Sequence, residues 1–264
     1  PLDRRFFEEM PKAELHLHTD GALRVEDIAR IAQESGISLP GIPEPTREAV
    51  EKYYAVSPGE RLDTPEKFAA FLSKFAPTIA LMSTPQEMRE AMRAHVRNLA
   101  RQNYVYAETR FAPQYHMKRG MSLHDVIENA LAGLSDGMRE VMSETNILVK
   151  LIIAIGRECD SETGVEVAEA ALQFRDRGVV AIDLACDEAT HPPQKHVKAF
   201  QATFGSRLKR TVHAGEFPTD FLTRIRNMHT SYTNLMADGF GHAIGIHRES
   251  GTLERAVDEQ TRIE

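Results

Sequence analysis

The chain has 264 residues, of which 42% are hydrophobic and 27% charged, enough to bury a substantial core in one large domain or two small ones. A net charge of −7, from 32 basic and 39 acidic residues, argues against binding to nucleic acid or an anionic membrane and leaves small molecules or proteins as partners. Two cysteines make no disulfide framework and no apolar segment is long enough to span a bilayer, so we expect a cytoplasmic protein.

Short apolar runs rich in Val, Ile and Tyr alternate with longer amphipathic segments, which predicts parallel strands joined by crossover helices. The expected strands are residues 13–18, 104–111, 147–155, 179–185, 210–215 and 239–244. The expected helices are residues 25–35, 64–80, 85–102, 122–142, 163–176 and 192–204. Because no glycine-rich phosphate turn follows the first strand, we predict a (β/α) barrel and not an open doubly wound sheet.

A long excursion follows the first strand. Residues 36–63 are rich in proline, and an insertion of this length in an α/β unit is typical of a lid or a binding loop. We therefore expect a single barrel domain over residues 1–264 with a lid-like excursion over residues 36–80.

The segment KAELHLHTDGAL, residues 12–23, indicates metal chemistry at the end of the first strand. Side chains alternate along a strand, so His16 and His18 share one face and lie about 6–7 Å apart. Two such imidazoles can converge on one zinc ion at about 2.0–2.1 Å each. A pair of hydrogen-bonded core histidines would leave the same pattern.

Two later strand ends add candidates. In RTVHAGEF, residues 210–217, His213 lies on the fifth strand and Glu216 follows the flexible Gly215. A histidine ligand beside a carboxylic acid suits metal-assisted hydrolysis. In GFGHAIGIH, residues 239–247, His242 again lies near a strand end, where a structural histidine is the alternative.

The segments KAELHLHTDGA, YAETRFAP, GVVAIDLACDE, TVHAGE and GHA occur in this order. Together they resemble the adenosine deaminase family of the metal-dependent amidohydrolase superfamily, from about residue 10 to the end of the chain. The resemblance implies a (β/α)8 TIM barrel, one Zn²⁺ and deamination of an aminopurine at C6. IDLACDE contains no lysine of the kind that bridges two metal ions in relatives, which favours a single zinc.

The resemblance also implies a role for each candidate. His16, His18 and His213 would be the zinc ligands, and His18 would also contact the substrate. Glu216 would give a proton to purine N1, and His242 would orient and help to deprotonate the attacking water.

Asp20 matches the residue that binds the ribose 5′-hydroxyl in adenosine-using members, although an Asp-Gly turn is the simpler alternative. Phe71, Leu72 and Phe75 occupy the place of an apolar lid helix, or else form the buried stripe of an amphipathic helix. Cys186 falls in a segment whose backbone approaches purine N3.

The sequence departs from the family pattern in two respects. Cys186 and Ala243 stand where glycine is usual, so the Cys186 side chain could reshape the base pocket. The chain also stops at QTRIE, where a seventh strand would start, and the aspartate that completes the zinc site has no counterpart. As explanations we consider first that the sequence is part of a longer protein, next that another chain supplies the missing strands, and last that this is a degenerate relative.

We expect a zinc-dependent deaminase that converts adenosine to inosine and ammonia. The alternatives are another adenosine-like substrate, such as aminodeoxyfutalosine or adenine, and a non-catalytic nucleoside-binding relative. Hydrolysis of a cyclic amide or ester is disfavoured, because Glu216 suits protonation of a ring nitrogen. The expected partner is a purine nucleoside, with no nucleic acid or membrane, and the sequence does not indicate the oligomeric state.

Overall fold

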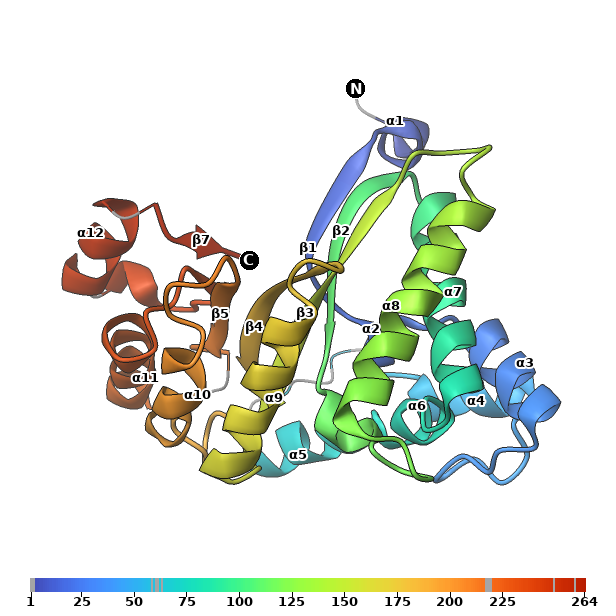
Figure 1. The fold of residues 1–264 in the computed structure, drawn as a ribbon, viewed down its shortest axis with the longest axis horizontal. Helices are drawn as coiled ribbons and strands as arrows, with labels where there is room; N and C mark the ends of the chain where they lie inside the picture. Colours follow the sequence, from blue (N-terminus) through green and yellow to red (C-terminus); the bar gives the residue numbers. More distant parts are fainter. Residues whose placement is uncertain are drawn as a thin grey trace. The chain divides into compact units, whose positions relative to one another are not determined.

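Strands and helices alternate along the chain (Figure 1). The computed structural model describes residues 3–57, 59, 62, 64–216, 220–248, 250–258 and 260–264. The strands are β1 (Lys12–His18), β2 (Tyr104–Phe111), β3 (Leu148–Gly156), β4 (Val179–Ala185), β5 (Lys209–Ala214), β6 (Gly239–His242) and β7 (Arg262–Ile263). The six expected strands are therefore confirmed to within two residues at each end, and β7 begins where the sequence analysis placed a seventh strand.

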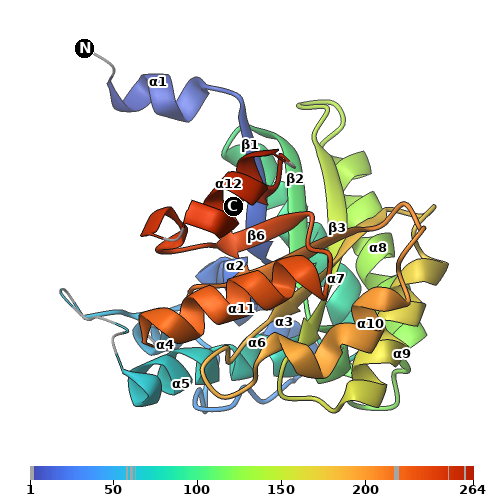
Figure 2. The same cartoon turned by 90° about the vertical axis from the view of Figure 1, so that its left-hand side faces the viewer.

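Helices fill the segments between strands, and Figure 2 shows α1 at the start of the chain, leading into β1. The helices of the first half are α1 (Arg4–Glu9), α2 (Thr19–Ala22), α3 (Val25–Ser35), α4 (Arg47–Tyr54), α5 (Pro65–Ser73), α6 (Ala76–Leu81), α7 (Pro85–Arg101) and α8 (Leu123–Glu140). Those of the second half are α9 (Ser161–Gln173), α10 (Val197–Gln201), α11 (Phe221–Thr233) and α12 (Ser250–Asp258). Short 3-10 turns are η1 (Pro113–His116), η2 (Pro193–His196) and η3 (Ile246–Arg248).

Two of the expected helices needed correction. The segment 64–80 forms two helices, α5 and α6, because the ring of Pro77 would collide with the carbonyl of Ser73 in a continuous helix. The segment 192–204 forms only the turn η2 and the short α10. The excursion contains α4, which was not expected, and α1, α2, α11 and α12 were also missed.

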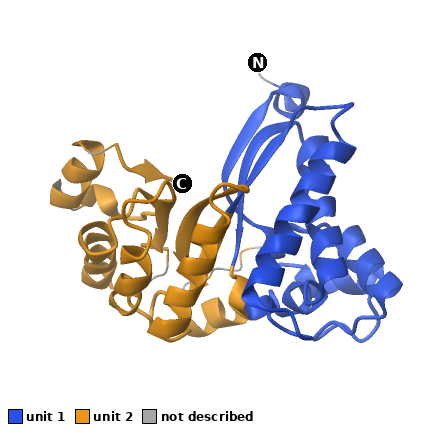
Figure 3. Ribbon diagram, viewed as in Figure 1, with its two compact units in different colours: residues 1–57, 74–111, 115–151 blue, residues 58–73, 112–114, 152–264 orange. Residues whose placement is uncertain are grey.

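The chain divides into two compact units (Figure 3). Unit 1 comprises residues 1–57, 74–111 and 115–151, and unit 2 comprises residues 58–73, 112–114 and 152–264. The boundary falls inside β3. The expected single domain is not tested by this division and stays a prediction.

All described strand pairings are parallel. In unit 1, β1 pairs with β2, and in unit 2, β4, β5, β6 and β7 pair in succession. The side chains of residues 152–155 on β3 are at most 1% exposed, as expected for a parallel strand covered on both faces. Within the described residues, no helix is both long enough and apolar enough to cross a lipid bilayer.

Unit 1 contains a close helix pair, α7 against α8. A Cβ atom built on Gly133 would lie 2.7 Å from the Cβ of Met92, and one on Gly137 would lie 2.6 Å from the Cβ of Val96. These separations are far below van der Waals contact, so the two glycines allow the helices to approach. At the rim, Arg93 Nε lies 2.5 Å from a Glu140 oxygen.

We predict that Gly133→Ala lowers the stability of the protein. Alanine normally stabilises a helix interior by about 1 kcal/mol relative to glycine. Here the added methyl group would also meet the backbone carbonyl of Arg89, and overpacking of this kind typically costs about 1–3 kcal/mol. Urea unfolding should show a net loss for this variant and none for Ser135→Ala, an exposed position on α8. Equal stability of the two variants would contradict the close packing.

Candidate active site

The first strand presents the predicted histidine pair. His16 and His18 lie on β1 with ring centroids 5.5 Å apart. The pairing of β1 with β2 shifts register between Glu14 and Leu17, which marks a β-bulge in the segment that contains His16. A bulge re-aims a side chain, and simple alternation along the sequence does not predict it. Unit 1 thus brings the two imidazoles together at the C-terminal end of β1.

Side chains of β2 hold the backbone of this histidine strand. The buried Arg110 donates from Nη2 to the Leu15 carbonyl at 2.6 Å. The buried Thr109 donates to the Leu17 carbonyl at 3.2 Å, and its hydroxyl oxygen lies 2.5 Å from that of Thr19. The segment YAETRFAP carries no predicted ligand, and its role here is to anchor the strand that does.

Asp20 lies directly after β1, in α2, and is only 6% exposed. Its Oδ2 lies 3.8 Å from Nε2 of the buried His116, whose Nδ1 donates to the Met82 carbonyl at 3.2 Å. Asp20 Oδ1 is buried and has no hydrogen-bond partner among the described residues. Burial raises the pKa of the nearby Tyr54 hydroxyl to about 12, and the Asp20 carboxylate acts in the same direction. A buried acceptor without a donor is costly, so Asp20 Oδ1 is an unsatisfied acceptor within the described part of the chain.

An aromatic side chain lies beside His18 within unit 1. The ring of Phe75 lies edge-on to the ring of His18, with centroids 6.4 Å apart. Gly21 makes room for it, since a Cβ there would lie 2.9 Å from Phe75 Cε1. Phe75 therefore lies close to His18, one of the predicted zinc-binding residues.

In unit 2, α5 faces the segments that follow β3 and β4. A cavity of about 450 Å³ lies between them, lined by Phe68 and Leu72 from α5 and by Glu158 and Asp187 from the two segments. Phe71 lies beside Phe68, with the rings tilted and their centroids 6.2 Å apart. The position of α5 at these strand ends agrees with the expected lid, which stays a prediction.

His213 on β5 is held by a buried carboxylate. Its Nδ1 lies 2.9 Å from Oδ2 of Asp183 on β4, and both side chains are at most 3% exposed. A carboxylate on one ring nitrogen orients an imidazole and directs the other nitrogen toward a ligand. Asp183 was missed by the sequence analysis, although a charged residue inside the apolar run VVAIDLA was a signal for it.

A second missed residue is Arg157, which directly follows β3 and is fully buried. It donates from Nη1 to the His191 carbonyl at 3.1 Å and from Nη2 to the His213 carbonyl. Burial lowers the pKa of its guanidinium, and the carboxylates of Glu188 and Asp183 act in the opposite direction. Arg157 therefore compensates buried negative charge around His213.

Glu216 follows β5, as predicted, and its backbone is held by a third buried acid. Glu188 accepts hydrogen bonds from the backbone N–H groups of Gly215 and Glu216 at 3.0 and 3.1 Å. Burial raises the pKa of the Glu216 carboxyl; His213 opposes this shift and Glu188 adds to it. A carboxyl with a raised pKa keeps its proton at higher pH and is suited to act as a general acid.

His242 closes β6 beside these groups. Its Nε2 lies 3.7 Å from Glu216 Oε2, and its ring centroid lies 5.3 Å from that of His213. The backbone of His242 has φ of +76°, and that of Ala243 has φ of +46°. Residues other than glycine held in this region are strained and cluster at functional sites. Unit 2 thus brings together three predicted residues: His213, Glu216 and His242.

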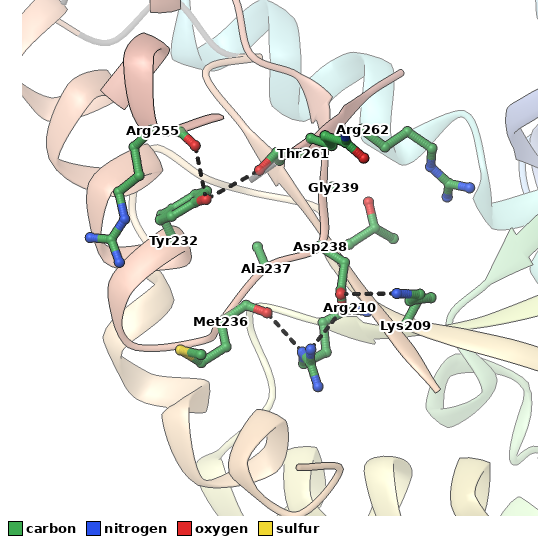
Figure 4. A pocket seen from close by; sticks show the side chains of 12 residues that line it. Lys209, Arg210, Tyr232, Met236, Ala237, Asp238, Gly239, Arg255, Thr261 and Arg262 are labelled. Atoms are coloured by element: carbon green, nitrogen blue, oxygen red, sulfur yellow. Dashed lines mark hydrogen bonds and ion pairs between the residues drawn. The ribbon is translucent and has the colours of Figure 1, made fainter. Parts of the chain in front are cut away.

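The cavity in Figure 4 lies at the other ends of the strands of unit 2. It measures about 600 Å³ and is lined by the first residues of β5, β6 and β7. Its charged groups have partners within unit 2: Asp238 pairs with Lys209 and Arg210 at 3.3 and 2.8 Å, Arg262 pairs with Glu264, and Arg255 lies over the Tyr232 ring. Active sites of (β/α) barrels lie at the C-terminal ends of the strands, so this cavity is not the candidate site.

Similarity to known proteins extends over nearly the whole chain. The sequence profile of the adenosine deaminase family matches residues 11–264. The chain belongs to the adenosine deaminase family. Adenosine deaminase of Mycobacterium leprae is 33% identical over 93% of this chain and 64% of its own length. Adenosine deaminase of Mycobacterium avium is 32% identical over 98% and 67%. The chain thus spans about 64–67% of the length of these adenosine deaminases.

Solved structures show the fold. An amidohydrolase from Burkholderia ambifaria with bound zinc superposes with a TM-score of 0.80, at 24% identity over 98% of this chain and 66% of that one. Adenine deaminase from Arthrobacter aurescens gives 0.76 at 26% identity over 96% and 71%. With the parallel strand–helix alternation, these likenesses confirm the predicted (β/α)-barrel class.

The two positions where glycine was expected share a backbone conformation. Cys186 has φ of +78°, in the left-handed region that glycine adopts without strain. Ala243, the other replacement of a usual glycine, also has a positive φ. Both positions therefore have a glycine-like backbone conformation although they carry side chains.

We predict that Cys186→Gly leaves the free energy of unfolding nearly unchanged. Glycine substitution normally costs about 0.5–1 kcal/mol, but here it relieves a left-handed conformation that costs a side chain about 1–2 kcal/mol. Cys159→Gly is the control: Cys159 is also partly buried but is not among the residues with positive φ, so it should lose about 1–2 kcal/mol. Urea unfolding measures both, and equal losses would contradict backbone strain at Cys186.

Proposed function

We propose that the protein is a zinc-dependent aminopurine nucleoside deaminase that acts at C6, with adenosine as its first substrate. The observation that carries this proposal is the group at the ends of β5 and β6, where Glu216, with a raised pKa, lies 3.7 Å from His242. Membership of the adenosine deaminase family supports the same reaction.

We propose His16, His18 and His213 as the ligands of one Zn²⁺. Three imidazoles are a common donor set of catalytic zinc sites. The buried Asp183 on Nδ1 of His213 is the outer-shell partner that metal-binding histidines usually have, so the residues fit the metal. When bound, zinc would supply an activated water for attack on an electrophilic carbon.

The side chains of the chain itself would carry the proton transfers. Glu216 would hold a proton for purine N1, which makes C6 more electrophilic. His242 would orient the attacking water and accept its proton. The backbone at Cys186, with its glycine-like conformation, would approach purine N3.

The proposed substrate is a nucleoside because of Asp20. Its buried Oδ1 has no partner among the described residues, and a sugar hydroxyl would satisfy it as a donor. A phosphate at the same place would set a second anion against this carboxylate, which is unfavourable at short range. Adenine or an adenosine-like nucleoside such as aminodeoxyfutalosine is the alternative substrate. A non-catalytic relative would bind nucleosides without turnover.

The direct test is ammonia release from adenosine by the protein supplied with Zn²⁺. We expect turnover that is lost after treatment with a chelator and restored by added zinc. Glu216→Gln should lower kcat by roughly 100- to 10,000-fold, the usual contribution of a general acid. Nucleoside binding without turnover by the zinc-loaded protein would contradict the proposal in favour of the non-catalytic alternative.

Asp20→Ala should distinguish a nucleoside from a base as substrate. The variant loses a hydrogen bond between a carboxylate and a hydroxyl, which is worth about 1.5–3 kcal/mol, so kcat/KM for adenosine should fall roughly 10- to 100-fold. Adenine has no sugar and should be affected much less. Asp27→Ala, at the partly buried start of α3, removes the same charge elsewhere in unit 1 and is the control. Equal losses for adenosine and adenine would show that Asp20 does not contact the sugar.

A further inference from the structure

The buried acid Glu188 is not explained by the proposed catalytic roles. It lies in the segment after β4 and is only 2% exposed. Its carboxylate accepts three hydrogen bonds, from the backbone of Gly215, from the backbone of Glu216 and from Asn227 Nδ2, at 3.0, 3.1 and 3.1 Å. Asn227 is itself buried on α11. Burial of a carboxylate is costly unless its oxygens are satisfied, so this arrangement holds its partners firmly.

The two backbone donors come from consecutive residues. Gly215 has φ of +76°, and a Cβ atom there would lie 3.0 Å from the backbone nitrogen of Ile244. This conformation turns the N–H groups of residues 215 and 216 toward the same carboxylate, as in the anion-binding concavities formed by successive amides. Glu188 therefore fixes the backbone that follows β5, from which the Glu216 side chain extends.

We propose that Glu188 is a positioning residue that holds Glu216 in place for proton transfer to the substrate. The inference rests on the proposed function, since Glu216 is the acid of that reaction. It follows from geometry, because a displacement of about 1 Å at a reacting group can cost about 100-fold in rate. Glu188 contacts the backbone of Glu216 and would affect the reaction only through Glu216.

Glu188→Gln tests this role, because glutamine has nearly the same shape as glutamate. The glutamine oxygen can still accept from Gly215 and Asn227, but its NH₂ group would face the N–H of Glu216, donor against donor. We expect kcat for adenosine to fall roughly 10- to 100-fold with KM changed less than about 3-fold, because ground-state binding is kept while transition-state geometry is lost. Zinc content should match that of the wild type.

A matched control is available on a neighbouring segment. Glu158 also accepts a backbone N–H at 3.1 Å, but from Asp187 on the segment after β4. Glu158→Gln removes the same charge and should leave kcat within about 2-fold of wild type. Should Glu188→Gln fail to fold, Asn227→Ala removes only the third contact and should lower kcat by a smaller factor, roughly 3-fold.

Amide hydrogen exchange provides a readout that does not depend on turnover. In Glu188→Gln the amide of Glu216 should exchange at least about 10-fold faster, while the amides of α11 stay protected. Unchanged kcat, equal loss of kcat in both glutamine variants, a joint fall of kcat and zinc content, or unchanged exchange at Glu216 would each overturn the positioning role. A wild-type protein that deaminates no aminopurine would instead refute the proposed function, and faster exchange at Glu216 would still show that Glu188 holds this backbone.

Discussion

The buried ionic group around His213 is the interaction on which the rest of the site in unit 2 depends. Asp183 contacts the imidazole at 2.9 Å, and Arg157 donates to the backbone carbonyl of the same histidine. Removing one partner would leave an uncompensated buried charge, which typically costs about 3–5 kcal/mol. The ends of β3, β4 and β5, which supply Arg157, Asp183 and His213, are therefore held to one arrangement.

Backbone strain gathers at the same strand ends. Gly215, Cys186, His242 and Ala243 all have positive φ, and each lies within two residues of the C-terminal end of β5, β4 or β6. Three of the four carry side chains, for which this conformation costs free energy. At these turns His242 and Glu216 lie 3.7 Å apart. Strain of this kind is typical of sites whose geometry matters more than local stability.

Family segments without a predicted ligand have a definite role in this arrangement. In YAETRFAP, Thr109 and Arg110 hydrogen-bond to the backbone of β1 and so fix the strand that carries His16 and His18. In VVAIDLACDE, Asp183 orients His213, and Glu188 fixes the backbone of Glu216. The positions that support the proposed ligands thus lie on the neighbouring strand or on the segment after it.

The sequence by itself determined the alternation of strands and helices, and it located the histidines and Glu216 at strand ends, because hydrophobic periodicity and residue spacing are local properties. The break between α5 and α6 was signalled by Pro77 but was not predicted, whereas the bulge before His18 depends on the register with β2 and has no local signal. Only the tertiary structure showed that Cys186 takes a left-handed backbone and that Arg157, Asp183 and Glu188 support the proposed catalytic groups. These features join residues 28 to 56 positions apart or fix a backbone torsion, and such long-range pairings come from packing, which no short stretch of sequence encodes.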